Sequence, residues 1–171
     1  MIFMSQSGIT DASRARDWDA WYVDHLHLML TVPGILSAQR FGTDAPGYSP
    51  SLAMYTIPGA EVFEDPYYLS VRGMGEWLPL IDRRYYHRNL FSGLDRAPPV
   101  AAGARLVVAD REREDGALAD LKLTWLACVA LDRSTPLRGI AVMDAAAADR
   151  IRSRDLAVYR PMTGHMTAEK K

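Results

Sequence analysis

The side chains best suited to chemistry in this sequence gather in one stretch near its start. From Asp11 to Arg40 the chain reads DASRARDWDAWYVDHLHLMLTVPGILSAQR. At the helical period of about 100° per residue, His25 falls on the apolar stripe of this stretch, one turn from Trp21 and Tyr22. Imidazole titrates near neutral pH and is tuned by burial, so His25 is our candidate general acid or base. A core histidine with a structural role is the alternative interpretation.

A second histidine on the same stretch, His27, does not extend this site. Its spacing from His25 puts the two rings on opposite faces of a helix, which argues against a two-histidine metal site. No cluster of His, Cys and carboxylate residues has metal-ligand spacing, and no Gly-rich phosphate loop is present. We therefore expect no metal and no cofactor. A haem ligand would have to be His25 or His87 alone.

The segment Tyr85-Tyr86-His87-Arg88 is the second group with chemical potential. In a strand, Tyr86 and Arg88 share one face and Tyr85 and His87 the other, because side chains alternate. We expect Tyr86 or His87 to act opposite His25, by polarising the substrate or donating a proton to it. A tyrosine-rich interface or edge strand is the alternative.

Five further residues are candidates for binding a substrate: Trp21, Tyr22, Arg40, Tyr55 and Trp77. The aromatic residues suit a flat organic molecule, and Trp77 lies in a segment rich in glycine and proline that could form a lid or a small core. The planar guanidinium of Arg40 suits a substrate carboxylate, although a structural Asp or Glu would serve as its partner equally well.

Composition places the chain among ordinary globular proteins. It has 171 residues, 49% of them hydrophobic, and a net charge of −1, which gives no field to attract nucleic acid or an anionic membrane. Cys128 is the only cysteine, so no internal disulfide forms, and its apolar neighbours predict an inert thiol. With neither a signal peptide nor an apolar run of membrane-spanning length, we expect a cytoplasmic protein.

Both halves of the sequence predict the element order β-α-β-β-α-β. In the first half, a helix capped by Thr10 or Asp11 runs to about Thr31 and stops at Pro33-Gly34. The other elements expected in the first half are strands at 2–5, 35–41 and 52–57, a broken helix at 60–82, and a last strand or an arm at 83–90. In the second half we expect strands at 105–110, 123–131, 139–143 and 156–159, and helices at 114–122 and 144–152. We predict one unit over residues 1–96, a linker at 97–103 and a shorter unit over 104–171.

The motif Trp21-Tyr22-Val23-Asp24-His25-Leu26, followed by the turn and strand Val32-Pro33-Gly34-Ile35-Leu36-Ser37-Ala38-Gln39-Arg40-Phe41, resembles the dimeric α/β-barrel superfamily, most closely its EthD-like members. The resemblance implies an α+β fold in which two ferredoxin-like units form an α/β barrel, within one chain or across a homodimer. It also implies a pocket between the helices and the sheet.

The resemblance further implies a cofactor-free isomerase, cyclase or lyase. Combined with the residues above, it predicts proton transfer on an aromatic or lactone-like carboxylic substrate, with His25, Tyr86 and His87 catalytic. Two alternatives stay open: a non-catalytic protein that binds a small ligand in a catabolic or biosynthetic pathway, and a haem-binding relative.

Overall fold

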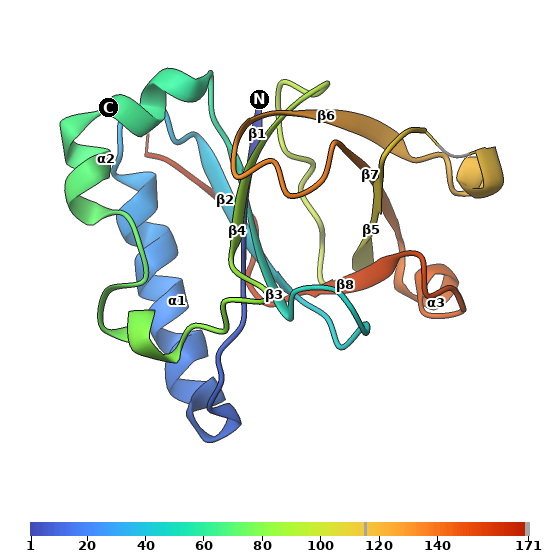
Figure 1. The fold of residues 1–171 in the computed structure, drawn as a ribbon, viewed down its shortest axis with the longest axis horizontal. Helices are drawn as coiled ribbons and strands as arrows, with labels where there is room; N and C mark the ends of the chain where they lie inside the picture. The colour runs from blue at the N-terminus through green and yellow to red at the C-terminus, as the bar shows by residue number, and fades with distance from the viewer. Residues whose placement is uncertain (115, 170–171) are drawn as a thin grey trace.

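The computed structural model describes residues 1–114 and 116–169, and one antiparallel sheet dominates it (Figure 1). The strands are β1 (Ile2–Ser7), β2 (Ser37–Gly42), β3 (Ser51–Thr56), β4 (His87–Ser92), β5 (Ala104–Arg111), β6 (Thr124–Leu131), β7 (Leu137–Asp144), β8 (Ala157–Pro161) and β9 (Met166–Thr167). The helices are α1 (Ala15–Leu30), α2 (Pro66–Val71) and α3 (Ala145–Ala148), with 3-10 turns η1 (Ala12–Arg14), η2 (Ala60–Glu64), η3 (Gly75–Leu80) and η4 (Gly116–Leu121).

Eight of these strands close into a barrel within one chain. Their order is β3-β1-β4-β6-β7-β5-β8-β2, and β2 pairs again with β3. The two halves of the chain meet at two places, where β4 pairs with β6 and where β8 pairs with β2. The β2–β8 ladder holds only the pairs Phe41–Pro161 and Gly42–Arg160, and β9 occupies the other end of the same β2 edge. Closure satisfies the strand edges that an open sheet would expose.

The predicted fold class of two ferredoxin-like units in an α/β barrel is wrong. The structure is a single closed antiparallel barrel made mostly of sheet, and helices α1 and α2 lie outside only one side of it (Figure 1). The strands of both halves fall near their expected positions, but the helices expected in the second half do not form as such. The predicted division at 97–103 falls in the connection between β4 and β5 and stays a prediction.

The missing second helical layer has a physical cause in the sequence. Only Ala145–Ala148 of the expected helix 144–152 is helical, and the expected helix 114–122, of which Asp115 lies outside the described residues, is the 3-10 turn η4. The four alanines offer little apolar area, and the polar residues Asp149, Arg150 and Arg152 follow them. A helix without a broad apolar stripe gains little by packing on a sheet, so this one stays short.

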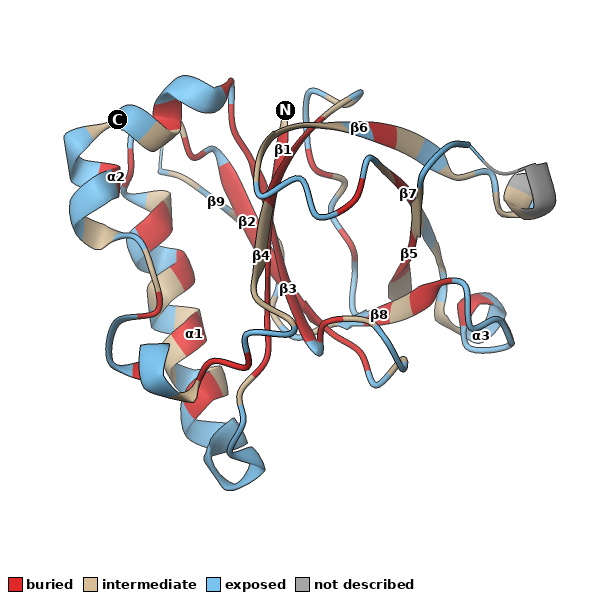
Figure 2. Ribbon diagram, in the orientation of Figure 1, coloured by how far each residue is buried: buried red, intermediate tan, exposed pale blue. Residues whose placement is uncertain are grey.

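The barrel interior is filled by side chains that alternate along the strands. Figure 2 shows the buried residues concentrated on the barrel strands and on the barrel-facing side of α1. The inward-facing cluster combines both halves of the chain: Ile2, Met4, Phe41, Leu52, Met54, Phe91, Leu106, Val108, Leu126, Ile140, Ala157 and Tyr159 are among its members. Alternate residues of β1 to β4 point outward and pack under the helices.

Helix α1 covers the outer face of the first four strands. Its buried residues are Trp18, Tyr22, Leu26 and Met29, whereas Leu28 is exposed. At 100° per residue the centre of this face lies about 55° from His25, so the histidine borders the buried stripe instead of occupying its middle. The helix ends before Gly34, which takes a φ of +89° that favours glycine.

Candidate functional site

A small cavity lies between helices α1 and α2 and the outer face of β1, β3 and β4. Its volume is about 20 Å³, close to that of a single water molecule. We call it the helix-side cavity, and it is lined by Phe3, Ser5, His25, Met29, Tyr55, Tyr68, Arg72, Gly73, Met74, Tyr86 and Arg88. Three predicted site residues therefore meet here: His25, Tyr55 and Tyr86.

His25 is partly buried at the edge of this cavity. Its ring stacks on Trp21, with centroids 4.7 Å apart and planes 10° from parallel, and meets the edge of Tyr22 at 5.9 Å. Burial lowers the pKa of His25 to about 4, because the charged imidazolium loses its hydration there. His25 is therefore neutral at pH 7, and a neutral imidazole has one nitrogen able to accept a proton.

The side chains around the start of β4 alternate between two sides of the barrel wall and separate Tyr86 from His87, the two alternative partners expected for His25. Tyr86 and Arg88 line the helix-side cavity, while Tyr85 and His87 line a different cavity at the end of the barrel. The predicted division of this segment between two faces is thus confirmed. Of the two predicted partners of His25, only Tyr86 lies at the same cavity, and the structure does not bring His87 to it.

Phenol and guanidinium groups supply most of the polar lining of the helix-side cavity. Burial raises the pKa of Tyr55 and of Tyr68, and the positive charges of Arg88 and Arg72 partly oppose the rise at Tyr68. These two phenols therefore stay protonated at neutral pH and can donate hydrogen bonds. Two cations beside protonated phenols and a neutral imidazole favour an anionic ligand.

Arg40 does not reach the helix-side cavity. Its side chain is 2% exposed and lies under α1, where Nη1 pairs with Asp19 Oδ1 at 2.8 Å and Nε donates to Ser51 Oγ at 2.9 Å. The guanidinium carbon also lies 4.2 Å from the ring centroid of Tyr22. This is the structural carboxylate partner that the sequence left open, and it places Arg40 in the packing of α1 against β2.

The remaining predicted aromatic residues lie behind the residues that line the cavity. Trp21 contacts it only through His25, and Tyr22 is fully buried beside Arg40. Trp77 packs edge-on against Trp18 at 5.2 Å and under the guanidinium of Arg14, so it belongs to the helical core and not to a lid. None of these three residues lines the helix-side cavity.

Three polar lining residues are not among the predicted site residues: Ser5, Arg72 and Arg88. Arg88 carried a usable signal, because it lies two residues from Tyr86 on the same strand face. Ser5 is the cross-strand partner of Arg88, and that pairing follows from register, which the sequence did not specify. Tyr68 and Arg72 follow the cap formed by Asp65, whose carboxylate accepts bonds from the backbone N–H groups of Tyr67 and Tyr68.

The helix-side cavity does not fit a large prosthetic group. A space of about 20 Å³ cannot contain a haem, so the cavity beside His25 does not fit one. Across residues 1–114 and 116–169, no three His, Cys, Asp or Glu side chains lie close enough together to hold a metal ion. Within the same residues, no helix combines the length and apolarity needed to cross a membrane.

No protein-family model, curated protein or solved structure matches the chain at a significant level. The resemblance to EthD-like proteins therefore stays a prediction, and the fold and the cavities carry the functional argument.

Proposed function

We propose that the protein is a small enzyme that moves a proton within an anionic aromatic or lactone-like substrate at the helix-side cavity. The reaction would be an isomerisation, cyclisation or elimination of the lyase type, run without a cofactor. His25 would take the proton, Tyr86 would donate one or polarise an oxygen, and Arg72 and Arg88 would hold the carboxylate. The two arginines replace Arg40 in that role.

One observation carries this proposal: His25, Tyr86 and two arginines line the same small cavity. General acid–base catalysis needs a base and an acid that converge on one substrate, and a fixed cation that orients it. Buried residues such as Tyr55 and Met74 form part of the cavity wall, and this low-dielectric surface strengthens electrostatic interactions with developing negative charge.

His25 is neutral at pH 7 and can act as a base whose strength depends on whether an acidic substrate is bound. Its pKa of about 4 makes the empty site a weak base. A bound carboxylate or a developing enolate would stabilise the imidazolium and raise that pKa toward neutrality. Proton abstraction would then be coupled to binding of the acidic substrate.

The cavity must enlarge to admit a substrate larger than water. Arg72, Gly73 and Met74 form one side of it, and Met74 is buried there. Gly73 and Gly75 flank Met74 with φ values of +99° and +49°. Outward movement of this short segment would open the space between α2 and the sheet. Arg72, which lies on the segment, would contact the substrate carboxylate when the segment closes again.

A second candidate function is ligand binding without catalysis. The observation in its favour is the parallel stacking of His25 on Trp21. A neutral, stacked imidazole with a lowered pKa can serve as an aromatic packing surface for a ligand without exchanging a proton with it. In that case the same anionic ligands would bind, but no covalent change would follow.

The two functions are separated by binding and turnover on the same compounds. A thermal-shift screen of aromatic carboxylates and lactones would identify ligands, and incubation in D₂O with proton NMR would reveal exchange at the acidic carbon. We expect exchange or conversion with the native protein and with His27→Ala, whose exposed ring lies on the opposite face of α1. We expect none with His25→Ala. Binding with no exchange in the native protein would support the non-catalytic candidate.

A further inference from the structure

A second cavity opens at the end of the barrel, on the inner side of the wall that bears the helix-side cavity. Its volume is about 450 Å³, which is within the range of small-molecule sites. Its lining includes Gln6, Ser49, His87, Asp110, Ser134 and Arg154, contributed by several strands and loops. We call it the barrel-end cavity. The proposed enzymatic function makes no use of it.

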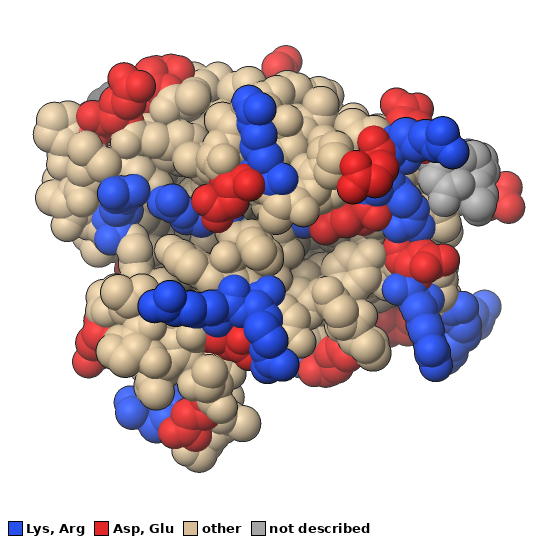
Figure 3. Space-filling view, viewed as in Figure 1, with Lys and Arg blue, Asp and Glu red and all other residues tan. Residues whose placement is uncertain are grey.

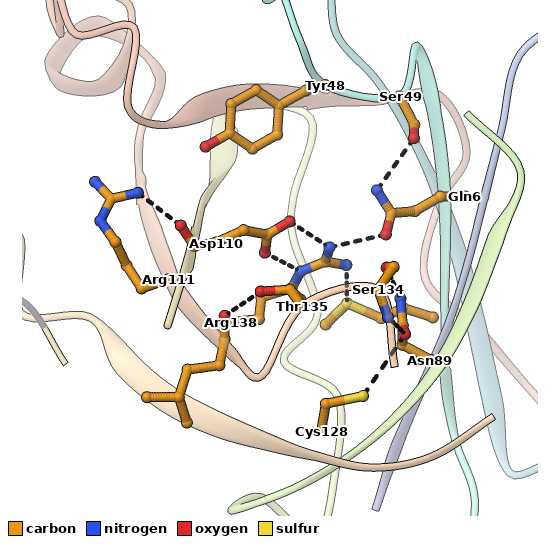
Figure 4. Close-up of polar contacts among 12 residues, drawn as sticks. Gln6, Tyr48, Ser49, Asn89, Asp110, Arg111, Cys128, Ser134, Thr135 and Arg138 are labelled. Atoms are coloured by element: carbon orange, nitrogen blue, oxygen red, sulfur yellow. Dashed lines mark hydrogen bonds and ion pairs between the residues drawn. The ribbon is translucent and has the colours of Figure 1, made fainter. Parts of the chain in front are cut away.

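At the floor of the barrel-end cavity, the partly exposed carboxylate of Asp110 is held by the buried guanidinium of Arg138 (Figure 4). Arg138 is 1% exposed, and its Nε and Nη2 each donate a 2.7 Å hydrogen bond to the Asp110 carboxylate. Nη2 also donates to Gln6 Oε1 at 2.8 Å. Gln6 in turn donates to Ser49 Oγ at 3.1 Å, so the amide orientation is fixed by both partners. A site built from such fixed groups needs little rearrangement to bind.

The Asp110 carboxylate at the floor of the cavity can accept further hydrogen bonds. The Asp110 side chain is 30% exposed, and the two bonds from Arg138 use about half of the acceptor positions of a carboxylate. Ser134 is held beside it, because its backbone N–H donates to Asn89 Oδ1 at 2.9 Å and its Oγ accepts from Asn89 Nδ2 at 2.8 Å. The Ser134 hydroxyl hydrogen and the free Asp110 acceptor positions can therefore exchange hydrogen bonds with ligand hydroxyls.

One exposed cation at the cavity suits an anion of single charge. Of the arginines there, Arg84 pairs with Asp82 and Arg138 pairs with Asp110. Among the residues that the structure describes, no ion-pair partner is found for Arg154, which is exposed at the rim. On the face of Figure 3, basic and acidic side chains are interspersed.

We propose that the barrel-end cavity binds a small hydroxylated monocarboxylate of the sugar-acid type. Arg154 binds the carboxylate at the rim, Asp110 accepts hydrogen bonds from ligand hydroxyls at the floor, and Ser134 donates to a further hydroxyl. The polar lining selects this class over the aromatic acids proposed for the helix-side cavity. The two sites are independent, because different faces of β4 serve them.

Isothermal titration with D-gluconate tests the proposal on the full chain. We expect saturable binding with a Kd below about 1 mM, and at least about tenfold weaker binding of glucose, which lacks the acid, and of acetate, which lacks the hydroxyls. Equal binding of acetate or inorganic phosphate would show a general anion effect and overturn the proposal. Tighter binding of glucose 6-phosphate would overturn the assignment to a monocarboxylate, and so would an absence of saturation at about 10 mM gluconate.

Variants locate the binding to the cavity. Arg154→Gln is expected to weaken gluconate binding about tenfold or more, and Ser134→Ala about threefold, as expected for a charged and a neutral hydrogen bond. Arg152→Gln is the matched control, because Arg152 is also exposed but lies outside the barrel-end cavity. His25→Ala should leave gluconate binding unchanged, which separates this site from the proposed enzymatic one. Unchanged affinity in both Arg154→Gln and Ser134→Ala would refute the proposed site.

Discussion

Tyr86 and His87 are adjacent in sequence, yet their side chains line cavities on opposite sides of the barrel wall. Tyr86 immediately precedes β4 and lines the cavity with His25 under the helices, whereas His87, the first residue of β4, lines the cavity with Asp110 at the barrel end. One short segment thus contributes to two separate polar spaces, one of which contains a candidate general base and the other a buried ion pair.

The lowered pKa of His25 predicts a pH-dependent loss of stability. The unfolded chain binds a proton near pH 6.5, but the folded chain does so only near pH 4. Between these values the unfolded state holds more protons, so the free energy of unfolding falls as pH decreases from about 6.5 to 4. Comparing urea unfolding at pH 7 and 4.5, we expect His25→Gln to lose about 2 kcal/mol less than the native protein. An identical loss in both would contradict the burial of His25.

The Arg40–Asp19 pair predicts a role in stability. Asp19→Asn leaves the guanidinium of Arg40 buried without its carboxylate, and we expect a loss of about 2 kcal/mol, because Asp19 itself is half-exposed. The control is Asp17→Asn, since the Asp17–Arg14 pair is exposed on both sides and should contribute less than about 0.5 kcal/mol. Urea denaturation measures both. If Arg40 instead anchored substrate, Asp19→Asn would alter ligand affinity without a change in the unfolding midpoint.

The Arg138–Asp110 pair predicts strong non-additivity. Asp110→Asn leaves a wholly buried guanidinium with the amide of Gln6 as its main remaining acceptor, and we expect a loss of about 3 kcal/mol. Arg138→Met in the same chain removes that uncompensated charge and should restore part of the stability. Chemical denaturation of the native protein, both single variants and the double variant forms the cycle. Simple addition of the two losses would show that the pair is not coupled.

Alanine substitutions at two glycines distinguish the cost of backbone strain from the cost of a steric clash. Gly34 and Gly47 have φ values of +89° and +84°, but a Cβ at Gly34 would lie 2.7 Å from Val62 Cγ2, whereas one at Gly47 meets nothing within 4 Å. Gly47→Ala should therefore lose about 1 kcal/mol from strain alone, and Gly34→Ala about 2–3 kcal/mol. Thermal unfolding compares them. Equal losses would mean that Val62 moves aside without cost.

Local patterns in the sequence located the strands well but not their assembly. Alternating and apolar runs marked the eight barrel strands, and Pro33-Gly34 marked the end of α1. The joins of β4 to β6 and of β8 to β2 are contacts between distant segments, which periodicity does not specify. The fold class was wrong for this reason, and because an alanine run followed by charged residues was read as a full helix.

The site could be predicted only in part, because some of its residues are recognisable from local patterns and others depend on how distant segments pack. His25 and Tyr86 were found because their residue types and faces are readable within one helix and one strand. The cavity also depends on strand register and on the segment after α2, which bring Ser5 and Arg72 beside them. Arg40 shows the converse, because its buried partner Asp19 lies on the same helix as His25 but its pairing depends on how that helix docks.

The short ladder between β2 and β8 gives the barrel a weakest line. Only two residue pairs join these strands, and Pro161 in one of them has no N–H to donate, whereas β5 and β7 share eight pairs. Amide hydrogens along the β2–β8 seam should therefore exchange with solvent at a lower free energy than those of β5 and β7. The barrel would open first between β2 and β8, and the two halves of the chain would then remain joined through the β4–β6 ladder.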